Sequence, residues 1–492
     1  LNTKALNLKA AILRKLKRFE ETKQLTSNTL SIDPLDFWAM NETYLVESAT
    51  GSKSRTENIL FDLKIKMRNE VQSYLELAVD YGNAGFLNEA IDVLLRAVEI
   101  KKEPLSTYPM LYYYLGFYSQ QKGDKDNASK YYSMAQKMPT DYCFPFRLDS
   151  IDVLNAAVKN NPSDARAYYY LGNLLYDIQP ENAIRAWEKS RQLDNTFATT
   201  HRNLGWAYYR TEKDIPKAIA SYEKAIACNK KDPIVYTELD ILYEAGQVTP
   251  QKRLELLEAN HQTVIQRNDS FLREIMALVQ VGRLDNAIDF LTKYHFHLRE
   301  GGGEIHDVYV DAYLLRGLRK FKKRKYHEAL EDYLAASEYP ENLQVGRPKN
   351  DRRAPQVAYF IAAAYKALGK NEKAQNLYST AAQQPQTSQW PQTQYYQALV
   401  FQQLGQKEKA KEIFTKLINT GKEKLAEDIS MDFFSGFGQH RSKESRMADA
   451  HYTIALGYLG NGETQKAKAE FRKAVDLNIS HLWAKTQLSE LE

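Results

Sequence analysis

The sequence contains very little cysteine. Its 492 residues include only two cysteines, Cys143 and Cys228, which lie far apart along the chain. Two cysteines cannot build the network of several disulfides that stabilises many small secreted domains. They also cannot supply a structural zinc site made of cysteine ligands. Both classes of protein are therefore excluded.

Long apolar runs and a large excess of one charge are missing as well. No run of eighteen or more apolar residues occurs, so the sequence predicts no membrane-spanning helix. The 67 basic and 62 acidic residues leave a net charge of +5, which is too small to indicate a nucleic-acid or membrane partner. The densest basic run, 320–325, is interpreted as a solvated turn between two helices, where lysine and arginine also favour the helix dipole.

What the sequence does contain is a recurring spacing of small and aromatic residues. Clear copies run from Ala362 to Ala381 and from Ala455 to Ala474. In each copy a small residue is followed three positions later by an aromatic, then by glycine, and then by the pattern Ala-x3-aromatic-x2-Ala. This spacing resembles the tetratricopeptide repeat, a helical hairpin with a period near 34 residues.

Each position of the pattern has a steric reason. The small residues lie where the two helices of a hairpin approach most closely, and the aromatic side chains fill the space that they leave. A glycine between the helices adopts the left-handed conformation that ends the first helix at little cost. The glycines at this position are Gly85, Gly123, Gly282, Gly369, Gly405 and Gly462.

The predicted fold is therefore all-α, a right-handed superhelical solenoid of about ten to twelve helical hairpins. Repeats are expected over 1–293, 308–339 and 356–492, with irregular stretches at 35–70 and 141–162. The repeats are interrupted by a Gly-rich loop at 294–307, a linker loop at 340–355 and an insertion at 419–447. A helix at 481–491 would cap the end of the stack.

Local signals refine this outline at four places. A flexible point at Gly51 is expected to precede a helix that starts near Glu57. Only one helix is evident in 141–162, so that hairpin is expected to be incomplete. Pro250 is expected to open a long helix that ends near Gln266. Asp240 stands where the repeat pattern has glycine or alanine.

Two asparagines are candidates for ligand binding. Asn173 and Asn203 occupy first-helix positions at which peptide-binding relatives hold an asparagine that bonds the ligand backbone, and Tyr169 and Arg202 lie beside them. An amide both donates and accepts hydrogen bonds, which suits a peptide group. Because Tyr169 replaces a lysine and Glu238 replaces an arginine, a clamp for a C-terminal carboxylate is not expected. The alternative is that the asparagines only satisfy neighbouring repeats.

The second half of the chain carries a more specific resemblance. It is similar to the repeat region of bacterial proteins whose N-terminal domain, of unknown function, is like galactose mutarotases and related carbohydrate-binding β-sandwiches. The residues that carry it are 236–240 with Leu242 and Tyr243, 253–260, Phe296-His297, 300–302, 339–343 and 346–348. Family members usually continue the Phe-His pair with Pro-Trp, whereas Leu298 and Arg299 stand here. The resemblance implies that a β-sandwich domain precedes Leu1 in a longer protein.

The loop at 294–307 is the sharpest local candidate for chemistry. His295, His297 and His306, with Glu304 and Asp307 nearby, are side chains that zinc accepts. The favoured interpretation is instead a loop that packs against a neighbouring domain, through Phe296, His297, Glu300, Gly301, Gly302 and Glu304. Three glycines at 301–303 do not predict a phosphate site, since no strand precedes them and no Gly-Lys-Ser/Thr follows.

Nothing in the sequence predicts catalysis. No Ser-His-Asp order, paired carboxylates or nucleophile elbow can be proposed from the spacing, and no cofactor is expected. The predicted function is a non-catalytic protein-interaction scaffold, which binds a protein or peptide in its concave groove or packs against its own upstream domain. The alternative is an accessory part of a carbohydrate-active enzyme whose catalytic domain lies upstream. The sequence predicts no location in the cell.

Overall fold

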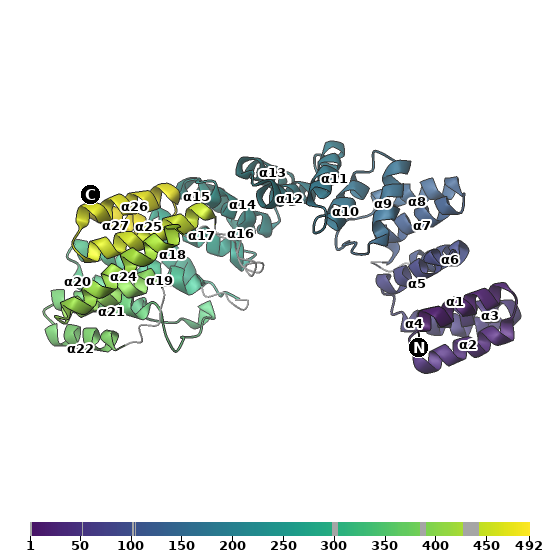
Figure 1. Cartoon of the computed structure of the whole chain (residues 1–492), viewed down its shortest axis with the longest axis horizontal. Helices are drawn as coiled ribbons and strands as arrows, with labels where there is room; N and C mark the ends of the chain where they lie inside the picture. Colours follow the sequence, from purple (N-terminus) through teal and green to yellow (C-terminus); the bar gives the residue numbers. More distant parts are fainter. Residues whose placement is uncertain are drawn as a thin grey trace. The chain divides into compact units, whose positions relative to one another are not determined.

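The chain is built from helices throughout the part that the structure describes (Figure 1). The computed structural model describes residues 2–51, 53–100, 103, 105–297, 304–383, 390–426 and 442–492, and no strand occurs among them. The described residues divide into two compact units, unit 1 (Leu1–Thr211) and unit 2 (Glu212–Glu492). Consecutive helices form hairpins in both units, which confirms the predicted all-α solenoid of tetratricopeptide-type hairpins.

Unit 1 holds the first twelve α-helices and a short 3-10 helix, η1 (Leu105–Thr107). The α-helices are α1 (Thr3–Lys15), α2 (Phe19–Ile32), α3 (Phe37–Thr50), α4 (Lys53–Lys66), α5 (Val71–Asn83), α6 (Leu87–Glu99), α7 (Pro109–Gln121), α8 (Lys125–Lys137), α9 (Asp149–Asn160), α10 (Ala165–Leu175), α11 (Pro180–Leu193) and α12 (Ala198–Ala207). A π-helical turn, η2 (Tyr208–Glu212), follows α12.

Unit 2 holds the remaining helices and a second 3-10 helix, η3 (Glu341–Leu343). The α-helices are α13 (Ile215–Cys228), α14 (Pro233–Ala245), α15 (Pro250–Ala259), α16 (His261–Val264), α17 (Asn268–Val281), α18 (Leu284–Lys293), α19 (Glu304–Lys322), α20 (Tyr326–Ala335), α21 (Ala354–Ala367), α22 (Asn371–Ala382), α23 (Pro391–Gln403), α24 (Lys407–Ala426), α25 (Lys443–Gly460), α26 (Thr464–Leu477) and α27 (Leu482–Leu491). The last of these is the helix predicted at 481–491.

The small residues of the repeat pattern lie where the hairpin is tightest. A Cβ atom built on Gly116 of α7 would lie 2.6 Å from the ring of Tyr132 on α8, and one on Gly317 of α19 would lie 2.4 Å from the ring of Tyr333 on α20. Real Cβ atoms do not approach a ring so closely, so only glycine fits at these two positions. The steric interpretation of the pattern is thereby confirmed in both units.

The six glycines between paired helices all adopt the left-handed conformation. Their φ angles lie between 72° and 89°, a region that other residues enter only with strain. The amide of the following residue then bonds back to the helix, as Phe86 does to the carbonyl of Tyr81 after Gly85. The prediction that glycine ends the first helix of these hairpins is confirmed.

Two predicted helix bounds were wrong. In 35–70 the helices are α3 and α4, and α4 begins at Lys53 rather than near Glu57. The helix that Pro250 opens ends at Ala259 rather than near Gln266, since the Asn260 side chain donates to the Leu256 carbonyl (2.8 Å) and terminates it. In 141–162 the only α-helix is α9.

Asp240 lies at the centre of a buried ionic cluster in unit 2. Arg253 on α15, whose side chain is fully buried, donates to both Asp240 carboxylate oxygens at 2.8 Å. Arg273 on α17 forms a second ion pair with the same carboxylate. The carboxylate that interrupts the repeat pattern on α14 thus joins three helices. A buried charge of this kind is tolerated only when it is paired and hydrogen-bonded.

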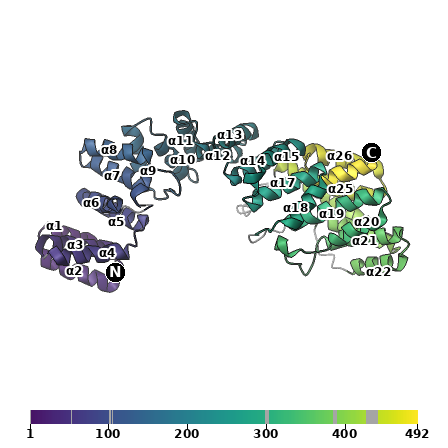
Figure 2. The same cartoon turned by 180° about the vertical axis from the view of Figure 1, so that it is seen from behind.

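The C-terminal end of unit 2 returns to the helices with which the unit begins. Arg253 donates to the Ser480 hydroxyl at 2.7 Å, and the Ile479 amide donates to the Gln247 side chain at 2.9 Å. The indole of Trp483 on α27 donates to Asp311 on α19 at 2.8 Å. In both views α26 lies close to α15 (Figures 1 and 2). The turn between α26 and α27 therefore ties the two ends of unit 2 together.

Candidate functional site

The four residues predicted to bind a ligand lie on two first helices of unit 1. Tyr169 and Asn173 belong to α10, and Arg202 and Asn203 belong to α12. The position of α10 is fixed at its start, because the Asp164 side chain accepts hydrogen bonds from the amides of residues 166 and 167 (3.1 and 3.0 Å). Such an N-cap satisfies amides that would otherwise lack a partner.

The two asparagines are hydrogen-bonded to each other. Asn203 Nδ2 donates to Asn173 Oδ1 at 3.0 Å. The indole of Trp187 on α11 donates to the same oxygen and to the Tyr169 carbonyl, both at 3.1 Å. Both amides are half-buried. The structure thus brings Tyr169, Asn173 and Asn203 together, and whether the amides also hold a ligand stays a prediction.

Tyr169 forms the buried side of this surface. Its ring packs edge-on against Phe197 at 4.9 Å between centroids, and Arg166 stacks on the other side of Phe197 at 3.7 Å. Burial raises the pKa of Tyr169, and this outweighs the opposing effect of the Asn173 amide. Tyr169 is therefore a neutral hydroxyl at physiological pH, not a charged group that could replace a clamp lysine.

The sequence pattern did not indicate that a tryptophan beside Asn203 belongs to the candidate site. Trp206 follows Asn203 by one helical turn on α12 and keeps 37% of its surface exposed. Its ring lies 5.9 Å from that of Tyr209, and the Arg210 guanidinium lies 5.5 Å from its centroid. The available signal was the spacing, since an apolar residue three positions after Asn203 shares its side of the helix.

The neighbouring first helices of unit 1 are covered by the chain itself. Residues 143–147, which belong to no helix or strand, form a segment that precedes α9. Cys143, which is fully buried, interacts with Tyr108 and with Tyr170 of α10, and burial raises its thiol pKa to about 11. Arg147 donates to Glu76 of α5 at 3.3 Å. An extended stretch of polypeptide therefore already lies across these helices, whereas α10 and α12 expose Trp206.

The loop predicted to face another domain packs into unit 2 where it is described. Phe296 is 1% exposed, stacks on Phe271 at 5.5 Å and donates its amide to the Asn342 carbonyl at 2.8 Å. The His297 carbonyl accepts a hydrogen bond from Asn268, and exposed Glu304 opens α19. The other predicted residues of this loop, Glu300, Gly301 and Gly302, lie outside the described residues, as does most of the predicted insertion, 427–441.

The three histidines of this region have separate surroundings. The rings of His295 and His297 lie 4.9 Å apart and are exposed. His306 is buried, stacks on Tyr339 at 3.7 Å and bonds to the Glu338 carbonyl at 2.9 Å. Burial lowers the pKa of His306. In the part of the chain that the structure describes, no three His, Cys, Asp or Glu side chains are grouped to hold a metal ion.

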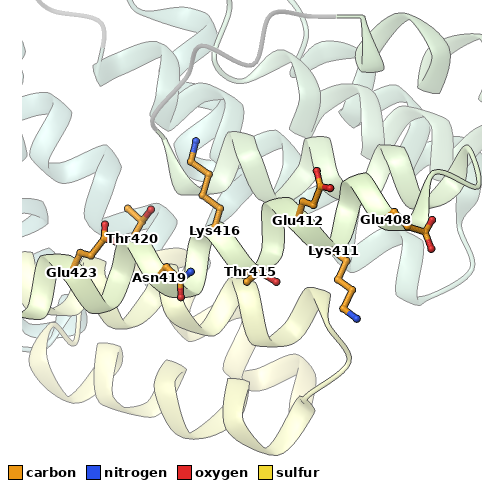
Figure 3. Close-up of a pocket in the computed structure, with 8 residues that line it drawn as sticks. All are labelled: Glu408, Lys411, Glu412, Thr415, Lys416, Asn419, Thr420 and Glu423. Atoms are coloured by element: carbon orange, nitrogen blue, oxygen red, sulfur yellow. The ribbon is translucent and has the colours of Figure 1, made fainter.

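A surface hollow on unit 2 has the wrong shape for a ligand pocket. All of its lining residues lie on α24, so it is one polar face of a single helix rather than an enclosed cavity (Figure 3). These residues are Glu408, Lys411, Glu412, Thr415, Lys416, Asn419, Thr420 and Glu423. Binding pockets enclose most of a ligand and are lined mainly by apolar groups.

The basic run 320–325 is occupied by contacts within unit 2. Lys320 pairs with Asp332 at 2.8 Å, Lys325 pairs with Glu328 at 2.9 Å, and Lys322 pairs with Glu490 of α27. These lysines stabilise the hairpin of α19 and α20 and the docking of α27. Among the described helices, none is both long enough and apolar enough to cross a membrane.

Comparison with known families identifies the repeats. Three segments match tetratricopeptide repeat models, at residues 148–179, 392–420 and 448–478. These segments are tetratricopeptide repeats. The first contains all of α9 and α10 with the Tyr169 and Asn173 positions, and the other two lie in the C-terminal part of unit 2. Repeats of this kind support a role as a protein-interaction scaffold.

Several solved structures are similar to this chain. YrrB, described as a tetratricopeptide repeat protein with an unusual peptide-binding site, is 22% identical over 38% of this chain and 91% of its own, with a TM-score of 0.30. Yeast Tom70 is 13% identical over 99% and 95%, with a TM-score of 0.31. MamA is 21% identical over 45% and 95%, with a TM-score of 0.18. These scores are low, and no property of the three proteins is transferred to this chain.

Proposed function

We propose that this chain is a non-catalytic protein-interaction scaffold, and that the surface of α10 and α12 in unit 1 binds an extended segment of a partner protein. We name this surface, made of Asn173, Arg202, Asn203 and Trp206, the amide–tryptophan surface. The observation that carries the proposal is the half-exposed pair of bonded asparagines beside an exposed tryptophan.

The asparagines and the tryptophan would contact different parts of the partner segment. The asparagine amides suit a peptide backbone, which presents both a carbonyl and an N–H group. Trp206 offers a large, rigid surface for an apolar side chain of the partner, and tryptophan is enriched among residues that dominate binding energy. Arg210 lies over its ring and the Tyr209 ring lies tilted beside it. Extended chain already lies across the adjacent helices at 143–147, which supports this mode of binding.

The resemblance of the second half of the chain suggests one specific partner. It favours a carbohydrate-related β-sandwich domain on the same polypeptide, and, as an alternative, an accessory role in a carbohydrate-active enzyme. Exposed His295, His297 and Glu304 are the described loop residues that such a domain could contact. This idea is tested by titrating the separately expressed upstream domain into residues 1–492. Absence of binding at high micromolar concentration would reject it.

The amide–tryptophan surface is tested with selected peptides. Twelve-residue peptides from a displayed random library would be selected on the whole chain and their dissociation constants measured. We expect Trp206→Ala to weaken the selected peptides by at least about tenfold, and Asn203→Ala by about three- to tenfold. Lys189→Ala, at an exposed position of the second helix α11, is the matched control and should change affinity less than about twofold.

Thermal unfolding of each variant separates binding from structure. Both variants should unfold close to the wild-type temperature, because Trp206 is exposed and Asn203 loses one half-buried hydrogen bond. Selected peptides that bind equally well to all three variants would place the binding surface elsewhere. A large loss of stability in Asn203→Ala would show that the asparagines serve only the packing of neighbouring repeats.

A further inference from the structure

A second surface of unit 1 exposes several large apolar side chains close together. It lies on the extended segment between α8 and α9 and comprises four side chains within seven residues. We name it the apolar ridge. Its members and their exposed fractions are Tyr142 (88%), Phe144 (67%), Phe146 (64%) and Leu148 (70%).

The alternation of exposure along the segment shows that the ridge is one-sided. Cys143, between the first two members, is fully buried, and Pro145 and Arg147 are partly buried. A period of two is that of an extended chain, in which alternate side chains point to the same side. Phe144, Phe146 and Leu148 therefore form a row on the outer side of the segment.

The inner side of the segment is firmly anchored. The Cys143 side chain is fully buried, and Arg147 donates to Glu76 on α5 at 3.3 Å. Just beyond the ridge, the Ser150 hydroxyl bonds to Tyr114 on α7 at 3.0 Å. The ridge is therefore held in place before anything binds to it, which lowers the entropic cost of an association.

The isolated chain gains nothing from this arrangement. Four large apolar side chains in water forgo the stabilisation that burial would give. Tyr142 also has a φ of 56°, in the left-handed region, which is strained for a bulky residue. Strain and exposure coincide at one short segment. Backbone strain that the surrounding structure maintains is typical of functional sites.

We infer that the apolar ridge is the contact surface of a homodimer, in which the ridges of two copies pack against each other about a twofold axis. A large apolar side chain offers roughly 150–250 Å², so at these exposures the ridge presents on the order of 600 Å². This reaches the upper end of the largest patch found on typical monomers. It approaches the roughly 800 Å² that each partner contributes to a standard interface.

The chemistry of the segment determines how two ridges would meet. Pro145 lies at the centre and has no N–H group, so the two segments cannot form a regular ladder of backbone hydrogen bonds. The contact is therefore made by side chains, and aromatic rings suit such packing. Exposed Asp141 precedes the ridge and partly exposed Asp149 follows it. In an antiparallel pair these carboxylates approach each other, so salt should strengthen the dimer by screening their repulsion.

The mass of the full chain in solution tests the dimer. We expect sedimentation equilibrium to give twice the chain mass for the wild type at about 50 µM, with tighter association at 500 mM than at 50 mM salt. The double variant Phe144→Asp, Phe146→Asp should lose the dimer, with a dissociation constant raised at least tenfold. Because both side chains are exposed, its unfolding temperature should stay close to that of the wild type.

A matched control fixes the position of the contact. Leu35→Asp introduces the same charge at another exposed apolar position of unit 1, where 59% of the residue is exposed, and should leave the dimer intact. A wild-type chain that stays monomeric at 100 µM would overturn the inference. So would a dimer that survives the double substitution, or a monomer that co-sediments with phosphatidylcholine vesicles through the ridge.

Discussion

The two units use the same hairpin but connect their ends differently. In unit 2, Gln247 and Ile479 are hydrogen-bonded across 232 residues, and Arg253 and Ser480 across 227 residues. Within the described residues of unit 1, the most widely separated pairs include Lys4 and Asp80, 76 residues apart. Unit 1 thus joins only helices from nearby repeats, whereas unit 2 joins its last turn to its first helices.

This difference has consequences for stability and for binding. A solenoid with contacts only between neighbouring repeats has nearly additive local stabilities. Contacts across more than 200 residues make distant helices depend on one another, so unit 2 should open as a whole. Unit 1 keeps the surface of α10 and α12 accessible, and it also carries the apolar ridge. The closed unit is therefore suited to rigidity, and the open unit to partner binding.

The largest effect is expected from Arg253→Ala. The substitution leaves the buried Asp240 carboxylate with one arginine fewer and removes the bond to Ser480, so unit 2 should lose about 3–5 kcal/mol. Urea unfolding of the variant would measure this loss. The control Arg283→Ala removes an exposed ion pair with Glu258 and should cost less than 1 kcal/mol. Equal costs for the two variants would mean that the buried Arg253 contacts do not stabilise unit 2 more than an exposed ion pair does.

One tryptophan in each unit gives the next contrast. Trp483 is 5% exposed and bonded to Asp311, so Trp483→Ala should destabilise unit 2 by about 3 kcal/mol. Trp206→Ala should destabilise unit 1 less, by about 1 kcal/mol, because 37% of the Trp206 surface is exposed. Urea unfolding of both variants would measure these two stability costs. A cost for Trp206 that matches that of Trp483 would show that Trp206 serves the core.

Acid should act in opposite directions on one buried carboxyl of each unit. In unit 2, burial raises the pKa of Asp240, but Arg273 and Arg253 outweigh it and hold the pKa below its usual value. The stability that Asp240 contributes is therefore present above about pH 4 and lost as pH falls through the lower folded value. In unit 1, burial raises the pKa of Asp164, so its contribution is present at low pH and lost as pH rises through the folded value.

Unfolding measured from pH 6 to pH 2 tests these signs. The stability difference between the wild type and Asp240→Asn should shrink on acidification. The wild type should gain stability relative to Asp164→Asn over the same range. Asparagine can still cap α10 at position 164, so this comparison isolates the proton. Differences that do not vary with pH would contradict both assignments.

The smallest difference between the two units is expected at the glycines that face aromatic rings. Gly116→Ala and Gly317→Ala each place a methyl group against the ring of the paired helix, at Tyr132 and Tyr333 respectively. Each should cost roughly 1–3 kcal/mol through forced movement of the ring. Thermal unfolding of both variants would show whether the same substitution destabilises both hairpins equally. A cost confined to one unit would mean that the repeats are not equivalent.

The sequence predicted the local features of this fold and missed those that join distant segments. The six hairpin glycines and the small positions facing aromatic rings follow from patterns within about 34 residues. Asp240 was visible only as a departure from the pattern, because its partners Arg253 and Arg273 lie on other helices. The bond between Arg253 and Ser480 spans 227 residues and leaves no periodic signal.

In the candidate site, too, the sequence predicted local positions but not the contacts between helices. The pattern placed Asn173 and Asn203 on the first helices of adjacent repeats, but their mutual hydrogen bond depends on the distance between α10 and α12. The apolar ridge was hidden because Phe144 and Phe146 could equally have been core residues. Only the burial of Cys143 between neighbours shows that their side chains point outwards.

Native-state hydrogen exchange tests the central contrast most directly. The whole chain would be compared with a chain that ends at residue 477 and therefore lacks α27 and the turn that carries Ile479 and Ser480. The closure of unit 2 predicts that the loss of this turn and of α27 accelerates exchange in α14, α15 and α17, while unit 1 keeps its wild-type protection. Unchanged protection in α14, α15 and α17 would contradict the account, because the two ends of unit 2 would then be stable independently.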